Sequence, residues 1–245
     1  MSSLSVSDAA RKEQTVKRNP LAEIMLGLGG VLTTAAFFMA FFWAPGTSYP
    51  DGRVDFAQKI FYFHVPVAEA SFLVFIFTAY YGIRFLMTRE RIYDTKARIA
   101  TEVTLFFVLL TMATGILWTR VEWGVWWQWE PRLTTYFILT LLVIAYFVLR
   151  NSVEDEEKRA VYASAFGILA FVDAPISFFI TRWLNSIHPI VFGGGESSGL
   201  ETSMLITFIV AQVGMLMLGY AFYQLRLREE ELRERLEALK IEIGD

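Results

Sequence analysis

Cysteine is absent from this chain of 245 residues, and histidine occurs only twice, at His64 and His188. The lack of cysteine excludes disulfides, thiolate metal sites, iron–sulfur clusters and the Cys-x-x-Cys-His motif of covalent haem attachment. Glycine and proline are also scarce, at 16 and 7 residues, whereas 16% of the chain is aromatic. Such a composition excludes a collagen-like or disordered chain. The net charge of −3 gives no indication of nucleic-acid binding.

Charged residues are scarce away from the two ends of the chain, and long apolar runs fill the space between them. A helix that crosses ~30 Å of hydrocarbon needs about 20 mostly apolar residues, which ordinary soluble domains do not contain in one run. Six runs qualify once short flanks are included: residues 21–43, 65–87, 100–118, 134–149, 161–181 and 200–223. The sequence therefore predicts an all-α polytopic membrane protein with six transmembrane helices. Residues 1–20 and 224–245 would flank a membrane domain, 21–223.

Lysine and arginine are distributed unevenly between the two sides of these runs. The N-terminal segment, the connections 84–98 and 150–159 and the tail hold 17 of the 22 basic residues, and the other three connections hold five. Basic residues accumulate on the cytoplasmic side of membrane proteins. The count predicts that both termini are cytoplasmic, and that the two histidines and a tryptophan-rich segment face the outside.

The C-terminal tail carries Leu232, Leu236, Leu239 and Ile243 at helical spacing among glutamates and arginines. This pattern predicts an amphipathic cytoplasmic helix. Two interpretations stay open: the apolar side packs on the rest of the chain, or it contacts a cytoplasmic partner.

Tryptophan is concentrated on the external side of the predicted topology. All seven fall there: Trp43, Trp118, Trp123, Trp126, Trp127, Trp129 and Trp183. If residues 123–130 are helical, three of these indoles share one face with Glu130. Such an interfacial helix would offer a broad aromatic platform to a flat ligand. The alternative is that the rings only anchor the helix at the membrane surface.

The two histidines lie at the external ends of predicted helices. His64 comes two residues before Pro66, which we expect in the first turn of the second helix, and His188 follows the fifth helix. Neutral imidazole is a common axial ligand of haem iron. The pair therefore predicts a six-coordinate haem site, and the alternative is that each histidine is a hydrogen-bonded packing residue.

Other ionisable residues lie near this side or within the spans. Arg120, Arg132 and Arg182 could pair with haem propionates, because guanidinium groups suit carboxylates, or they could reach lipid phosphates. Asp173 lies inside the fifth run, two residues before Pro175. An ionisable group inside a membrane is a functional candidate by default. We favour a structural role, in which neighbouring helices satisfy Asp173 at a turn loosened by the proline.

Three stretches together resemble the motifs of a known family. Residues 123–134, WGVWWQWEPRLT, closely resemble the tryptophan-rich "WWD" signature of the haem-handling membrane proteins. Residues 62–68, YFHVPVA, and 183–188, WLNSIH, resemble the two histidine motifs that flank it. With six spans and two external histidines, the chain is similar to the CcmC family of cytochrome c maturation. The resemblance covers about residues 21–223.

The resemblance implies a multi-pass protein of the bacterial inner membrane that handles haem at its periplasmic face. His64 and His188 would be the axial ligands of a transiently bound haem b, and residues 118–134 the platform. The expected partners are the periplasmic haem chaperone CcmE, the ABC-type complex of CcmA and CcmB, the small subunit CcmD and membrane lipid. Two residues depart from the family pattern, which usually has Asp at Glu130 and a small residue at Pro131. The role of the longer carboxylate is therefore open.

Two other functions fit part of the sequence. A permease, such as a haem exporter subunit of an ABC-type complex, would need a polar pathway near the middle of the membrane, and few polar residues lie there. A b-type electron-transfer subunit would hold one haem on one side only, which makes a poor transmembrane relay. Enzymatic activity stays open, since a lyase-like step at the haem is conceivable although no catalytic constellation is evident. We expect haem transfer to an acceptor.

Overall fold

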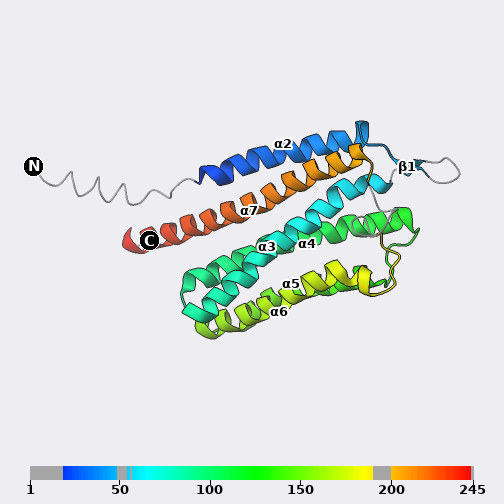
Figure 1. Cartoon of the computed structure of the whole chain (residues 1–245). Helices are drawn as coiled ribbons and strands as arrows, with labels where there is room; N and C mark the ends of the chain where they lie inside the picture. Colours follow the sequence, from blue (N-terminus) through cyan, green and yellow to red (C-terminus); the bar gives the residue numbers. More distant parts are fainter. Residues whose placement is uncertain (1–18, 49–53, 56, 190–199, 244–245) are drawn as a thin grey trace, which may run out of the picture.

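The computed structural model describes residues 19–48, 54–55, 57–189 and 200–243. The described part consists of six long helices and one two-stranded β-hairpin (Figure 1). The helices are α2 (Pro20–Phe42), α3 (Phe61–Thr88), α4 (Arg91–Glu122), α5 (Pro131–Ser152), α6 (Glu156–Trp183) and α7 (Thr202–Ile243). The hairpin pairs β1 (Thr47–Ser48) with β2 (Val54–Asp55), and a 3-10 turn (Ala57–Ile60) leads into α3. All six helices are long and apolar enough to cross a membrane, so the predicted all-α, six-span fold is confirmed.

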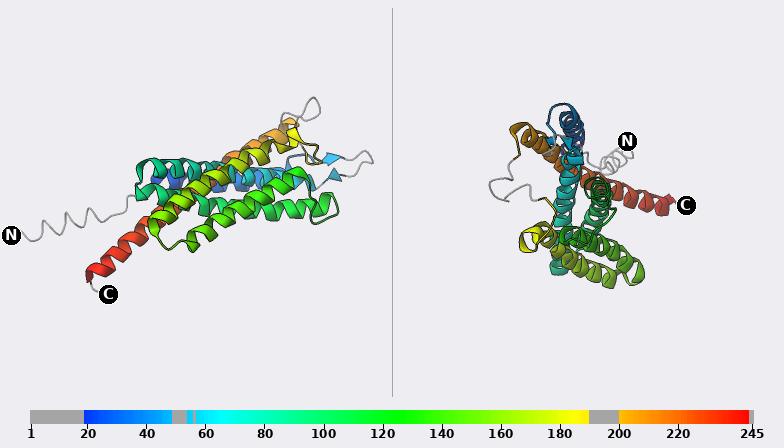
Figure 2. Two further views of the ribbon diagram at one scale, coloured as in Figure 1. Left: turned by 90° about the horizontal axis from the view of Figure 1, so that it is seen from below. Right: turned by 90° about the vertical axis from the view of Figure 1, so that its right-hand side faces the viewer.

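The helices are arranged as three stacked pairs, α2 with α7, α3 with α4, and α5 with α6 (Figure 2, right). α3 is central, because it also packs against α7 on one side and α6 on the other. The first residue of α2 and the last of α7 lie at the same end of the bundle (Figure 1). The first and last described helices thus begin and end at one end of the bundle, as the predicted topology requires, and the β-hairpin lies at the other end.

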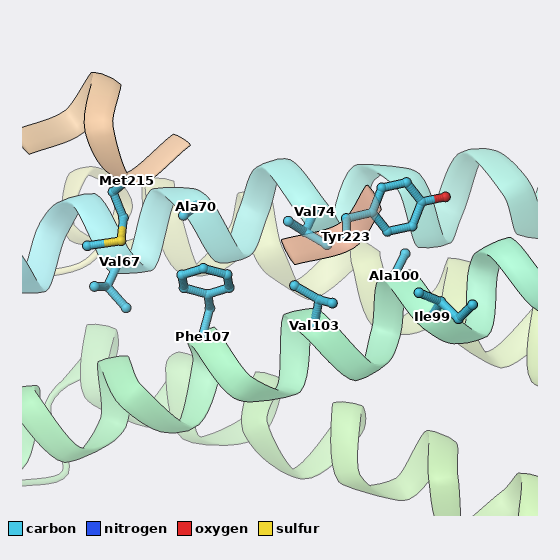
Figure 3. Packing of buried hydrophobic residues seen from close by; sticks show 9 residues of the cluster. All are labelled: Val67, Ala70, Val74, Ile99, Ala100, Val103, Phe107, Met215 and Tyr223. Atoms are coloured by element: carbon cyan, nitrogen blue, oxygen red, sulfur yellow. The ribbon is translucent and has the colours of Figure 1, made fainter. Parts of the chain in front are cut away.

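The core consists of apolar side chains from neighbouring pairs. One buried cluster joins the central pair to α7 (Figure 3): Val67, Ala70, Val74, Ile99, Ala100, Val103, Phe107, Met215 and Tyr223. A second cluster joins the central pair to α5 and α6: Phe75, Val108, Tyr136, Leu139, Val143, Ala170 and Ala174. Both clusters contain alanines, which let membrane helices approach closely.

Glycine allows the closest contact in the outer pair. A Cβ atom built on Gly29 of α2 would lie 2.9 Å from the backbone oxygen of Gly214 in α7. In turn, a Cβ atom on Gly214 would lie 2.8 Å from the hydroxyl of Thr33. Any side chain at either position would separate α2 from α7, so this crossing requires glycine.

One helix start differs from the expectation, and another agrees with the expected extension of the run 134–149 into its flank. Pro66 does not begin α3 but lies inside it, because the 3-10 turn and Phe61 extend the helix toward its N-terminus. Pro131 is the first residue of α5, and Glu130 caps that helix by accepting a hydrogen bond from the backbone N–H of Leu133 at 2.5 Å. Proline suits a first helical position, where its missing N–H costs nothing.

Ion pairs tie the helices together at the end of the bundle where α4 begins and α5 ends. Arg150 of α5 donates two hydrogen bonds to Asp94 of α4, at 2.6 and 2.9 Å, and both side chains are buried. Arg98 of α4 bonds to Glu102 and also to Glu230 of α7, the latter at 2.5 Å. The start of α4 is thereby fixed to both of its neighbours.

The C-terminal tail is helical, as predicted, and continues α7 without a break. At about 1.5 Å per residue, its 42 residues extend ~63 Å, roughly twice the thickness of the hydrocarbon core. Leu232, Leu236 and Leu239 are 48%, 53% and 42% exposed. The interpretation that they pack on the rest of the chain is therefore wrong for the described residues.

Candidate functional site

The tryptophan-rich segment between α4 and α5 is not helical. Residues 123–130 form bends and extended backbone, so the predicted platform helix is wrong. The residues at the two ends of this segment explain why it is not helical. Trp123 is the C-cap of α4 and is followed by Gly124 at φ +75°, whereas Glu130 is extended, as a residue before proline prefers.

Within this loop the indoles divide into two groups. Trp123 is half-buried, and its ring lies 4.9 Å from that of Trp118 at the end of α4. Trp127 is also half-buried and packs edge-on against Phe137 of α5, with ring centres 5.7 Å apart. Trp126 and Trp129 are exposed, as are Trp43 and Trp183. Only the first group is positioned to contact a ligand between the helices, and the exposed rings fit the anchoring interpretation.

His64 lies in the first turn of α3 and points toward α4. Its Nδ1 atom is 2.9 Å from the hydroxyl oxygen of Thr114. The Thr114 hydroxyl itself donates to the carbonyl of Leu110 at 2.9 Å, so its oxygen accepts the Nδ1–H of the imidazole. This bond leaves the Nε2 lone pair of His64 unused. The ring fits against Gly115, where a Cβ atom would lie 3.1 Å from Cε1.

His188 lies in the segment after α6, over the indoles at the end of α4. Its ring centre is 5.6 Å from that of Trp118 and 6.3 Å from that of Trp123. Its Nδ1 atom is buried and has no hydrogen-bond partner among the described residues. Burial lowers the pKa of His188 well below its usual value, and the charge of Arg132 lowers it further. The imidazole is therefore neutral at physiological pH, with a lone pair available to a metal.

Glu130 fixes the backbone around His188. One of its carboxylate oxygens caps α5, and the other accepts a hydrogen bond from the Ser186 hydroxyl at 2.5 Å. The Ser186 oxygen in turn accepts the backbone N–H of His188 at 3.1 Å. The Glu130 carboxylate is 3.9 Å from His188 Nδ1, too far for a hydrogen bond. Glu130 thus joins the start of α5 to the loop that carries His188.

Both histidines line one small cavity at the end of the bundle opposite the two termini. Its volume is about 70 Å³, and its wall also includes Trp118, Trp127 and Arg132. Ligand pockets commonly hold roughly 300–1,000 Å³. Five of the predicted site residues are therefore brought together, around a space smaller than most ligand pockets.

The remaining predicted site residues lie around this cavity or away from it. Trp123 contacts His188 from the rim, and Glu130 acts through Ser186. Arg120 donates to the backbone oxygen of Gly124 and lies 5.6 Å from the Trp126 ring centre. Arg182 is exposed and lies 5.4 Å above the ring of Phe178. Of the three external arginines, only Arg132 lines the cavity.

Several residues of the site were not singled out in the sequence. Glu69 and Tyr136 line the cavity, and Thr114, Gly115 and Ser186 hold the histidines. Four of them lie within the predicted transmembrane runs. The hydropathy of a run predicts a helix but does not indicate which of its residues contact the site. Ser186 belongs to the stretch WLNSIH, and its spacing from His188 was the only available signal.

Asp173 is separate from this site. Its Oδ2 atom is buried without a hydrogen-bond partner among the described residues, so the expectation of a fully satisfied carboxyl is wrong for that oxygen. Asp173 is also not among the residues that line the histidine cavity.

The donor set of the cavity fits haem better than it fits a bare metal ion. The described residues contain no group of three His, Cys, Asp or Glu side chains that could hold a metal ion. Two neutral imidazoles from different elements, indole rings and a guanidinium instead match the iron, the flat macrocycle and the carboxylates of one haem.

Comparison with known proteins gives consistent matches over most of the chain. The family model CcmC, described as Heme exporter protein C, matches residues 6–242. A ccmC-like mitochondrial protein of cytochrome c biosynthesis from Arabidopsis thaliana is 30% identical over 233 residues, which cover 91% of this chain and 86% of that protein. Heme exporter protein C of Bradyrhizobium diazoefficiens is 30% identical over 186 residues, which cover 75% of this chain and 70% of that protein.

Proposed function

The chain belongs to the CcmC, or Heme exporter protein C, family, and we propose that it binds haem b transiently at its periplasmic face and transfers it to a haem chaperone for the maturation of c-type cytochromes. The observation that carries this proposal is that the only two histidines of the chain line one cavity, although they come from α3 and from the segment after α6. A packing role for each histidine would not require them to meet.

Each histidine has a separate task in this proposal. His64 would bind iron through Nε2, because its Nδ1–H is already donated to Thr114. Such an outer hydrogen bond fixes the tautomer and the ring orientation of a ligating histidine. His188 would supply the second axial nitrogen from a loop held by Glu130 and Ser186.

The rest of the cavity would hold the macrocycle. Trp118 and Trp127 offer aromatic faces from the two sides of the loop, and Arg132 offers a guanidinium for a propionate. Arg120 and Arg182 lie farther out and are better placed to contact lipid phosphates.

Reversible binding, which transfer requires, is compatible with the chemistry of the chain. No cysteine is present to attach haem covalently, so only reversible iron–nitrogen bonds and stacking would retain it. Both ligands also lie at one end of the bundle, which fits delivery on one side of the membrane better than electron transfer across it. The basic residues favour the periplasmic side for this end. The proposed partners are CcmE as acceptor, with CcmA, CcmB and CcmD in one complex.

The test is a pair of variants, His64→Ala and His188→Ala, each purified and examined by absorption spectroscopy with and without imidazole. The wild-type chain should give a low-spin haem spectrum. Each variant should shift toward high spin, because one axial position opens, and added imidazole should partly restore the low-spin bands. A variant that keeps an unaltered low-spin spectrum would show that its histidine is not a ligand.

A matched control uses an aromatic residue outside the cavity. Trp183→Phe should leave the spectrum unchanged, since Trp183 is exposed and stacks only on Phe179, with ring centres 6.0 Å apart.

A further inference from the structure

A second and much larger cavity lies beside the histidine cavity, between α2 and the outer ends of α3 and α4. Its volume is about 920 Å³, which is within the usual range of ligand pockets. We call it the α2–α4 groove. Its α2 wall presents Phe37, Phe38 and Phe41, all of which are more than half exposed. The opposite wall is formed by residues of α3 and α4, including Phe63 and Trp118.

The groove is open because α2 packs along α7 and makes few contacts with the central pair. The glycine crossing at Gly29 and Gly214 holds α2 tightly to α7. The two helices form one edge of the bundle (Figure 2, right). The groove lies near the end that carries the histidines, because Trp118 lines both spaces.

Trp118 is the one described residue that lines both the groove and the histidine cavity. On the cavity side its ring contacts His188, at 5.6 Å between ring centres, and Trp123, at 4.9 Å. A change in the Trp118 rotamer would therefore join the two spaces. The histidine cavity alone, at about 70 Å³, does not have room for a macrocycle to enter without such a movement.

The groove also contains a buried positive charge. Lys59 is only 8% exposed, and its ammonium donates to the backbone oxygen of Ala44 at 2.5 Å. No carboxylate among the described residues forms an ion pair with it. A buried ammonium has three donors and favours an anionic partner. The groove therefore suits a flat aromatic molecule that carries a carboxylate.

We propose that the α2–α4 groove receives haem from the outer leaflet of the membrane, with a propionate at Lys59, and that Trp118 is the gate through which haem passes sideways into the histidine cavity. This inference rests on the proposed function. It adds the route of entry and a first binding site, which the two histidines do not specify.

The test compares two added indoles on α2. Thr34 lines the groove, and Val31, one turn earlier, is 64% exposed and does not line it. The full chain, free of haem, is placed in phosphatidylcholine nanodiscs, haem is added through the lipid, and growth of the low-spin spectrum is followed. Thr34→Trp should slow loading about tenfold or more with the same final spectrum, because the groove is filled while the ligands are intact. Val31→Trp should load at the wild-type rate.

The charge of Lys59 is tested with a neutral probe. Lys59→Gln keeps a donor for the Ala44 carbonyl but removes the positive charge. It should slow loading of haem and leave loading of haem dimethyl ester, which has no carboxylates, at the wild-type rate. Equal slowing of both probes would indicate a structural role and contradict the assignment of Lys59 to a propionate.

The outcomes separate this inference from the proposed function. If the wild-type chain never acquires a low-spin spectrum, the proposed function is wrong. If it does, and Thr34→Trp loads equally fast, haem enters elsewhere and the groove is not its route. The inference would also be overturned if the low-spin spectrum of Thr34→Trp reached a lower final amplitude than that of the wild type. A phospholipid that stays in the groove and is not displaced by haem would overturn it as well.

Discussion

At the scale of single residues, the site depends on side chains that hold the histidines as much as on the histidines themselves. Glu130 is one methylene longer than the aspartate expected at this position, and it reaches both the Leu133 N–H and the Ser186 hydroxyl. The longer side chain thereby connects a helix cap to the loop that presents His188. These two bonds indicate a positioning role for Glu130, which stays a prediction.

We predict that Ser186→Ala loosens the second ligand without removing it. The variant loses the bond from Ser186 to Glu130 and the acceptor for the His188 N–H, and a hydrogen bond of this kind contributes about 1 kcal/mol. Haem affinity should fall about fivefold, which corresponds to that free energy, with a partial shift toward high spin that imidazole reverses. The measurement is a haem titration followed by absorption spectroscopy.

Asn185→Ala is the matched control, because Asn185 is the exposed neighbour of Ser186. If the two variants bind haem with the same affinity and give the same spectrum, the connection through Ser186 has no role in positioning His188.

The sequence predicted five of the residues that line the cavity, but neither the other lining residues nor the contacts that hold the histidines. The two histidines, Trp118, Trp127 and Arg132 were identified from rarity, clustering and sidedness, and they do line one cavity. Contacts within apolar runs, such as Gly115 against His64, depend on the rotation of one helix against another. A hydropathy pattern does not determine how one helix is rotated against its neighbour.

At the scale of elements, apolar runs predicted each helix but not its ends. The third predicted run begins at Ala100, after the charged stretch at residues 89–98, whereas α4 begins at Arg91 and includes Asp94 and Arg98. These residues remain helical because Asp94 pairs with Arg150 of α5 and Arg98 with Glu230 of α7. The segment 123–130 was predicted as a helix because its tryptophans recur at helical spacing. Gly124, which has a positive φ and follows the last residues of α4, ends the helix instead.

Paired glycine variants test the contact between α2 and α7. Gly29→Ala should lower the free energy of unfolding by about 1–3 kcal/mol, because the new methyl group would meet the Gly214 carbonyl at 2.9 Å. Gly30→Ala should not destabilise, since nothing lies within 4 Å of a Cβ atom there. Thermal unfolding in detergent measures both variants. Equal unfolding temperatures would contradict close packing at this crossing.

At the scale of the whole molecule, the distribution of basic residues predicts the sidedness, and the bundle is compatible with that prediction because the start of α2 and the end of α7 lie together. The histidine cavity is at the opposite end. The predicted arrangement of six spans thus carries over to the structure, whereas the open groove beside α2 has no counterpart in the sequence pattern.

Reporter fusions test this orientation directly. A fusion at Gln128, in the tryptophan-rich loop, should be active only with a periplasmic reporter, and fusions at Arg89 and Val153, in the connections at the other end, only with a cytoplasmic one. The reason is that lysine and arginine are in excess at the end of the bundle that carries Arg89 and Val153. A cytoplasmic signal from Gln128 would place the haem cavity on the wrong side for a periplasmic acceptor.

The length of α7 has a mechanical consequence. The helix contains no proline and crosses α2 at Gly214, which divides it into an arm of about 18 Å toward Thr202 and an arm of about 44 Å toward Ile243. A stiff rod that tilts about this fulcrum moves its two tips in opposite directions, in proportion to these arms. A displacement of 1 Å at Thr202 therefore becomes a swing of about 2.4 Å at Ile243 and of about 1.5–2 Å at the exposed leucines of the tail, so that a tilt of α7 at one end of the bundle is amplified at the other.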